Sequence, residues 1–143
     1  MEKILISACL VGDKVKYDGK SNYTDKVKLL LEKYELVPFC PEVEGGLSIP
    51  RDPSEIKKDH VINKKGKDVT RNFENGADKA LNICLYLGIK IAILKENSPS
   101  CGTHKVYDGN FSNKLIDGMG VTAELLKRKG ITVISENEID TLL

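Results

Sequence analysis

The stretch Lys3-Ile4-Leu5-Ile6-Ser7-Ala8 is a short apolar run, and Cys9 follows it directly. Three further runs of this kind occur along the chain, at residues 35–39, 90–94 and 131–135. Apolar runs of this length, rich in branched side chains and bounded by turn residues, are typical of strands that are buried on both faces. We therefore predict four buried strands.

Segments with helical periodicity separate these runs. The spacing predicts a helix beginning near residue 24 and including Tyr34, and a longer one after residue 70 that stops at Gly88. A third is predicted from residue 121 to a stop at Gly130, and a capping box, Ser135-x-x-Glu138, predicts a last helix. Alternating strands and helices are typical of βαβ units. We predict a single α/β domain over residues 1–143, Rossmann-like and three-layered, with a mostly parallel sheet flanked by helices.

Two segments, residues 41–69 and 95–118, do not follow this alternation. Long loops inside a compact domain are usually functional, and we expect both to contribute to a site. Within the first, residues 61–63 and 68–69 are predicted to pair as a hairpin across Lys65-Gly66.

Composition narrows the class of partner. The chain has 22 basic and 21 acidic residues and a net charge of +1, which argues against a general nucleic-acid or membrane-surface binder. No apolar run approaches the roughly 18 residues of a membrane span, and the apolar N-terminal run is too short for a signal peptide. The sequence predicts a cytoplasmic protein with a small-molecule partner, and it does not determine the oligomeric state.

The chain has four cysteines, Cys9, Cys40, Cys84 and Cys101. Disulfides are rare in the cytosol, so these residues are expected to have another role. Cys9 and Cys40 directly follow the first two predicted strands, and Cys101 lies a few residues beyond the third. The C-terminal ends of parallel strands share one edge, where ligands bind, so these three thiols can converge. Cys84 lies on the apolar stripe of the long helix and is predicted to be a small buried hydrophobe.

Three interpretations fit three convergent thiols. A 4Fe–4S cluster held by three cysteines leaves one iron open as a Lewis acid for a substrate. Alternatively, Cys9, Cys40, Cys101 and His104 would complete a closed zinc site in a non-catalytic nucleotide- or anion-binding module. In the third interpretation the cysteines are unlinked residues of the core. Residue spacing alone does not decide between them.

Groups that can carry protons lie beside these cysteines. Glu42 comes two residues after the second cysteine, and Ser98 and Ser100 precede the last one. In the simplest interpretation the carboxylate is solvated and the serines form turns. Arg51 follows a glycine-rich stretch and either binds an anion or fixes its loop by a salt bridge, the more common arrangement. Gly102 can let backbone amides approach an anion.

Six motifs follow one another along almost the whole chain. They are Ser7-Ala8-Cys9-Leu10-x-Gly12, Tyr17-Asp18-Gly19, Cys40-Pro41-Glu42-x-x-Gly45-Gly46-Leu47-x-x-Pro50-Arg51, Asp68-Val69-Thr70, Ser98-Pro99-Ser100-Cys101-Gly102 and Tyr107-Asp108-Gly109-x-Phe111. In this order they resemble the thiouracil desulfurase family. Each motif is modest alone, whereas the ordered set is highly specific.

The resemblance implies a small α/β enzyme that removes sulfur from thiolated pyrimidines such as 2-thiouracil. The C=S group becomes C=O and sulfide is released, without net electron transfer. The resemblance also implies a 4Fe–4S cluster, acting as a Lewis acid, on three cysteines that match Cys9, Cys40 and Cys101. An acidic residue and a serine assist, which match Glu42 and Ser98. We expect Glu42 to accept the proton of the attacking water.

Under this resemblance the two Tyr-Asp-Gly segments, which alone read as Asp-Gly turns, become pocket loops. The expected pocket residues are Tyr17, Asp18, Arg51, Ser100, Gly102, Tyr107 and Asp108. The chain departs from the family at Lys16, where arginine is frequent, and at Asn113, where glycine is usual. Both departures concern substrate preference more than the cluster.

Overall fold

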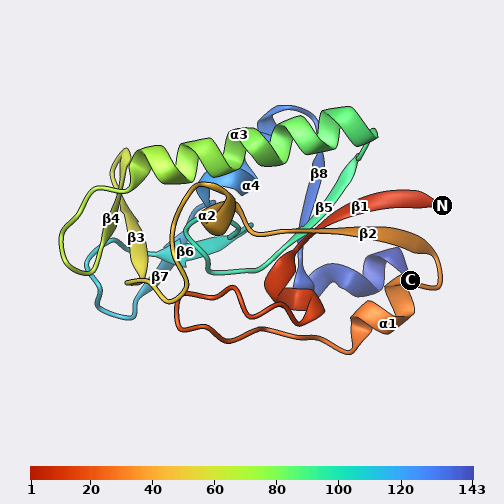
Figure 1. Cartoon of the computed structure of the whole chain (residues 1–143), viewed down its shortest axis with the longest axis horizontal. Helices are drawn as coiled ribbons and strands as arrows, with labels where there is room; N and C mark the ends of the chain where they lie inside the picture. The colour runs from red at the N-terminus through yellow and green to blue at the C-terminus, as the bar shows by residue number, and fades with distance from the viewer.

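The four predicted strands form one parallel sheet in the computed structural model, which describes residues 1–143 (Figure 1). They are β1 (Glu2–Ser7), β2 (Tyr34–Phe39), β5 (Ile91–Leu94) and β8 (Thr132–Ser135), in the spatial order β2-β1-β5-β8. All three strand pairs are parallel, as predicted. The prediction for Tyr34 was wrong, because the preceding helix ends at Leu30 and Tyr34 begins β2.

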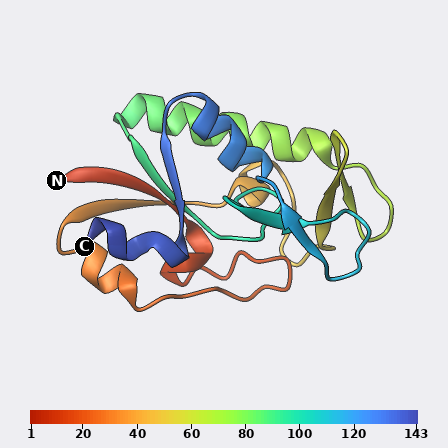
Figure 2. The same ribbon diagram turned by 180° about the vertical axis from the view of Figure 1, so that it is seen from behind.

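Helices cover both faces of this sheet (Figure 1, and from behind in Figure 2). On one face lie α3 (Thr70–Leu87) and α4 (Val121–Arg128), and on the other lie α1 (Lys26–Leu30) and the 3₁₀ helix η2 (Glu136–Leu142). The predicted stop of α3 at Gly88 is confirmed, and the predicted capping box opens η2. No helix combines the length and the apolar character needed to cross a bilayer.

The side chains of β1 point alternately to the two faces of the sheet, and this explains why the protein has three layers. Leu5 packs with Ala80 of α3 in one hydrophobic cluster, whereas Ile4 and Ile6 pack with Ile139 of η2 in another. Successive side chains of a strand point to opposite faces, so a continuous apolar run supplies two cores at once. The predicted three-layer α/β architecture is confirmed.

Residues 41–69 and 95–118, which interrupt the alternation of strands and helices, contain two antiparallel hairpins beside the sheet. One joins β3 (Ser54–Lys57) to β4 (His60–Asn63), and the other joins β6 (Lys105–Tyr107) to β7 (Leu115–Asp117). The pairing predicted across Lys65-Gly66 is present as an antiparallel bridge between Ile62 and Asp68, and the N–H groups of Asn63 and Val69 donate to the carbonyl oxygens of Lys67 and Val61, both at 2.8 Å. The prediction missed β3, with which residues 60–63 form their longer ladder.

Candidate active site

Cys9, Cys40 and Cys101 line one cavity of about 530 Å³ at the C-terminal edge of the sheet. β1 lies between β2 and β5, so the three strands that precede these cysteines are direct neighbours. Cys9 lies in the 3₁₀ helix η1 (Ala8–Val11), and Cys101 lies in the loop after β5. Cys84 lies 1% exposed in the core between α3 and the sheet. The volume is typical of a small-molecule site.

A glycine in α3 fixes the position of the second cysteine. The short helix α2 (Pro41–Glu44) begins directly after Cys40. A Cβ atom at Gly76 would lie 1.9 Å from the carbonyl oxygen of Pro41, so only glycine allows α3 to approach α2 this closely. This backbone contact holds α2, and with it Cys40 and Glu42, at the cavity.

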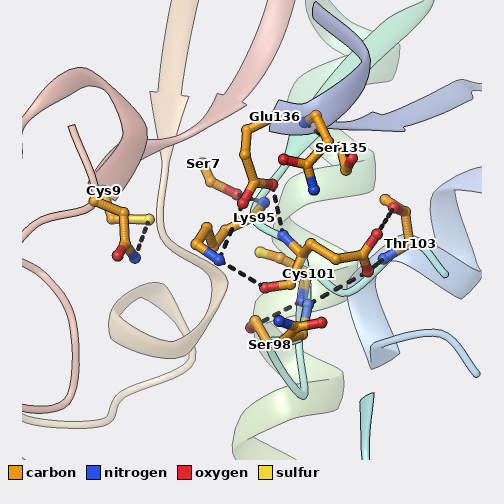
Figure 3. Close-up of polar contacts among 12 residues, drawn as sticks. Ser7, Cys9, Lys95, Ser98, Cys101, Thr103, Ser135 and Glu136 are labelled. Carbon is orange, nitrogen blue, oxygen red and sulfur yellow. Dashed lines mark hydrogen bonds and ion pairs between the residues drawn. The ribbon is translucent and has the colours of Figure 1, made fainter. Parts of the chain in front are cut away.

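Burial raises the pKa of all three cavity thiols. The pKa of Cys101 is raised to about 12, mainly by desolvation; the charges of Cys9 and Cys40 also raise it, and a hydrogen bond with Ser7 lowers it. Desolvation also dominates for Cys9, whose Sγ accepts a hydrogen bond from Asn22 Nδ2 at 3.5 Å (Figure 3). The three sulfurs are therefore close enough for their charges to oppose one another.

Thiols in this arrangement suit a positively charged metal centre, because a coordinated thiol loses its proton. No three His, Cys, Asp or Glu side chains are close enough together to hold a single ion. A mononuclear site needs all its ligands around one ion, whereas a cluster needs each cysteine to reach only its own iron. His104 lies outside the cavity wall, with Nε2 2.8 Å from Glu138 Oε1. The alternative zinc site with His104 is therefore not formed.

Glu42 lies in the cavity wall with both carboxylate oxygens hydrogen-bonded. Arg51 Nε donates to Oε1 at 3.1 Å, and Ser100 Oγ donates to Oε2 at 3.1 Å. The Arg51 side chain is 8% exposed and also donates to the carbonyl oxygens of Val15 (2.9 Å) and Ser48 (3.1 Å). Of the two roles considered for Arg51, the structure shows the salt bridge, and its partner is Glu42.

Ser98 and Ser100 extend this contact into a chain of hydroxyl groups. Ser98 Oγ accepts the backbone N–H groups of Ser100 and Cys101, both at 3.1 Å. These bonds occupy both lone pairs of Ser98 Oγ, so its hydrogen is left to donate, and Ser100 Oγ lies 3.0 Å away. Since Ser100 donates onward to Glu42, the chain runs from Ser98 through Ser100 to Glu42.

Sequence analysis missed Glu96, which organises the loop that carries Cys101. Glu96 is 8% exposed, and its carboxylate accepts the N–H groups of Thr103 (2.8 Å), His104 (2.9 Å) and Lys105 (3.1 Å), besides the Thr103 hydroxyl (2.9 Å). Desolvation raises the pKa of Glu96, but the hydrogen bonds from His104 and Lys105 outweigh it and the net shift is downward. These donors lie in the loop after β5 and at the first residue of β6, a segment without periodicity, so the sequence carries no signal for the arrangement.

Lys95 is a second residue of the cavity wall that sequence analysis missed. Its Nζ lies 3.0 Å from Glu136 Oε2 and donates to the carbonyl oxygen of Glu96 at 3.0 Å (Figure 3). The backbone N–H of Lys95 donates to Ser7 Oγ at 2.9 Å. The Lys95 charge lowers the pKa of Cys9, against the larger effect of desolvation. Lys95 therefore adds positive charge where thiolates must form.

Glu96→Ala is expected to lower the free energy of unfolding by about 2–5 kcal/mol, because it leaves buried N–H groups without an acceptor. Glu96→Gln is the matched control and is expected to lose less, since its amide oxygen still accepts. Folding lowers the pKa of Glu96, so its contribution is complete above the unfolded value of about 4.3 and is lost as pH falls through the folded value. Urea unfolding at neutral pH tests this expectation. An alanine variant as stable as the unaltered protein would contradict it.

The expected pocket residues divide into two groups. Tyr17 and Tyr107 line the cavity together with Arg51. Asp18 and Asp108 do not line it, because each carboxylate instead accepts the backbone N–H two residues further along, at 3.0 and 2.9 Å. These two aspartates shape the turns that carry the tyrosines.

Gly102 also lies outside the cavity wall, in close packing. A Cβ atom there would lie 2.7 Å from the carbonyl oxygen of Lys105 and 2.8 Å from that of Ser98. Its N–H donates to Ser98 O and is not free for an anion.

The two departures from the family, Lys16 and Asn113, both line the cavity. Asn113 has φ 59°, a left-handed conformation that glycine and asparagine adopt readily.

Fold and site together define an α/β protein whose strand ends place three thiols suited to an iron–sulfur cluster beside a carboxylate and two serines. Residues 4–138 match the 2-thiouracil desulfurase family, and the chain belongs to that family. Protein YbbK of Bacillus subtilis (strain 168), itself uncharacterized, is 41% identical over 150 residues, which are 98% of this chain and 99% of YbbK. The solved structure of the 4Fe–4S-dependent thiouracil desulfidase TudS matches with a TM-score of 0.94 and 45% identity, over 99% of this chain and 95% of TudS.

Proposed function

We propose that this protein is a non-redox, 4Fe–4S-dependent desulfidase that converts the C=S group of a thiolated pyrimidine such as 2-thiouracil into C=O. Water is the second substrate, and uracil and hydrogen sulfide are the products for 2-thiouracil. The observation that carries the proposal is the convergence of three thiols on one cavity that also contains the Glu42 carboxylate. Membership of the family and the 45% identity to a thiouracil desulfidase support it.

Cys9, Cys40 and Cys101 are the proposed ligands, and they leave one of the four irons without a protein ligand. When bound, the cluster supplies a Lewis acid that suits the soft sulfur of a thiocarbonyl group. Glu42 accepts the proton of the attacking water. Each of its oxygens has one donor in the structure and keeps a lone pair for a further hydrogen. Arg51 holds the carboxylate in this orientation.

The two serines carry the proton to the leaving group. Ser100 lies within hydrogen-bond distance of both Glu42 Oε2 and Ser98 Oγ, at 3.1 and 3.0 Å. Ser98 gives its own hydrogen to the departing sulfur, which frees a lone pair on its oxygen. Ser100 then passes its hydrogen to Ser98 and takes the proton held by Glu42, which restores the carboxylate. The opposite order, in which the carboxyl group acts first as an acid, uses the same three residues.

We also propose that the protein acts on small thiopyrimidines in the cytosol, without a nucleic-acid or membrane partner. The cavity volume of about 530 Å³ suits a base, nucleoside or nucleotide. All four cysteines are free thiols, which is typical of a reducing compartment. The net charge of +1 provides no general attraction for a polyanion.

Protein reconstituted without oxygen is expected to contain about four irons and four sulfides per chain and to convert 2-thiouracil into uracil and sulfide. Iron and sulfide analysis, together with loss of the thiocarbonyl absorbance, measures both properties. Iron-free protein is the control and is expected to be inactive. A colourless protein that takes up zinc but no iron would overturn the proposal in favour of a zinc-stabilised binding module.

A further inference from the structure

Phe111 is the one phenylalanine of the chain that lies outside the hydrophobic core. The other two, Phe39 and Phe73, are buried members of core clusters. Phe111 is half-buried, belongs to none of the three clusters, and lines the active-site cavity. A large apolar ring that packs into no core but faces a cavity is available to a ligand.

The backbone at Phe111 has a conformation that bulky residues rarely adopt. Its φ is 53°, in the left-handed region. The chain has four non-glycine residues with positive φ, and three of them, Asn97, Phe111 and Asn113, line this cavity. Asparagine tolerates this region, whereas phenylalanine gains nothing locally from it. Strain of this kind persists where the surrounding structure imposes it, and it is concentrated at ligand sites.

Glu55 imposes the left-handed backbone conformation of Phe111. This residue lies in β3 and in the cavity wall, and its Oε1 accepts the backbone N–H groups of Gly109 at 3.0 Å and Phe111 at 3.1 Å. On the other side of the loop, Ser112 Oγ donates to Asp108 Oδ2 at 3.0 Å. One carboxylate from a separate hairpin therefore fixes the loop that presents the Phe111 ring.

We propose that Phe111 is a specificity-determining residue whose ring stacks on the flat face of the pyrimidine, and that Glu55 is its positioning residue. The inference rests on the proposed function and names the contact that selects a planar, conjugated ring. The polar part of the remaining wall holds the groups that move protons. Stacking holds the base by its face and leaves its edge, where C=S lies, available to the thiols and Glu42.

Binding of uracil to the iron-loaded protein tests the stacking role of the Phe111 ring, because uracil is not turned over. Loss of a base–aromatic stack weakens binding by about 5- to 150-fold, and this range is expected for Phe111→Leu. Phe111→Tyr keeps the ring and is expected to bind like the unaltered protein. Dihydrouracil has the same carbonyl and N–H groups but a puckered, unconjugated ring. The unaltered protein is expected to prefer uracil over dihydrouracil, and Phe111→Leu to lose most of that preference.

Steady-state kinetics with 2-thiouracil tests the positioning role. Phe111→Leu and Glu55→Ala are expected to raise KM with little change in kcat per bound iron. Glu55→Gln keeps an acceptor oxygen and is expected to restore most of the affinity that Glu55→Ala loses. A general structural defect would instead lower iron content and kcat together.

The outcomes separate this inference from the proposed function. If the unaltered protein desulfurates thiouracil but Phe111→Leu binds uracil equally well, the stacking proposal is wrong and the function stands. If iron-loaded unaltered protein leaves thiouracil intact, the proposed function fails. In that case unequal uracil binding by Phe111→Leu and Phe111→Tyr still supports the ring contact, and equal binding overturns it.

Discussion

Cys101→Ser is expected to lose most of the bound iron and all measurable desulfuration. Cys101 is a buried residue of the cavity wall, and its sulfur interacts electrostatically with both Cys9 and Cys40. Three protein ligands are the minimum for this cluster, and a serine hydroxyl is a hard, rarely ionised replacement for a soft thiolate. Cys9→Ser and Cys40→Ser are expected to behave in the same way. Iron and sulfide per chain after anaerobic reconstitution is the measurement.

Cys84→Ala is the matched control, because it removes a buried thiol that lies outside the cavity. It is expected to keep its iron and its turnover, and to lower the free energy of unfolding by about 1–2 kcal/mol, as small buried truncations do. Iron lost from the Cys84 variant but kept by the Cys101 variant would reverse the assignment of ligands.

Glu42→Gln is expected to keep its cluster and to lower kcat by about 10²–10⁴-fold, the usual contribution of general acid–base catalysis. Glutamine preserves the shape of the side chain and an oxygen for the Arg51 hydrogen bond, but it cannot accept the proton of water. Rates are measured per bound iron, so that any loss of cluster is counted separately. A near-normal rate would place the base elsewhere in the cavity wall.

Ser98→Ala is expected to lower the rate less than Glu42→Gln, since water can replace a relay hydroxyl more easily than a fixed carboxylate. Ser98 also accepts two backbone N–H groups of the Cys101 loop, so this variant alone mixes a relay effect with a loop effect. Ser100→Ala interrupts the chain between Ser98 and Glu42 and leaves those two bonds in place. The relay is contradicted if Ser100→Ala retains the full rate.

The strands and the three converging cysteines were predictable because their signals are local. Burial on both faces gives a strand such as β1 a continuous apolar run, and the residue after such a run lies at the sheet edge whatever the loops do. Helix ends carry equally local signals, as at Gly88 and in the capping box of Ser135 and Glu138. The resemblance of six ordered motifs predicted the chemistry, and the comparisons confirmed the family and the fold.

The hairpins were harder to predict, because β3 is a four-residue, half-buried strand whose partner is selected by packing. For the same reason the sequence did not distinguish the tyrosines that line the cavity from the neighbouring aspartates that close their own turns. In an aperiodic loop no regular spacing sets the direction of a side chain, so this direction is decided only when the loop folds.

By itself, the amino-acid sequence determined the parallel α/β sheet, the three thiols at its edge and the family to which the chain belongs. Only the tertiary structure decided how the loop side chains pair: Arg51 with Glu42, Ser100 between Glu42 and Ser98, Glu96 beneath the Cys101 loop, and Glu55 behind Phe111. Periodicity and burial are properties of a few consecutive residues. A hydrogen bond between loops depends instead on how whole hairpins pack against the sheet edge.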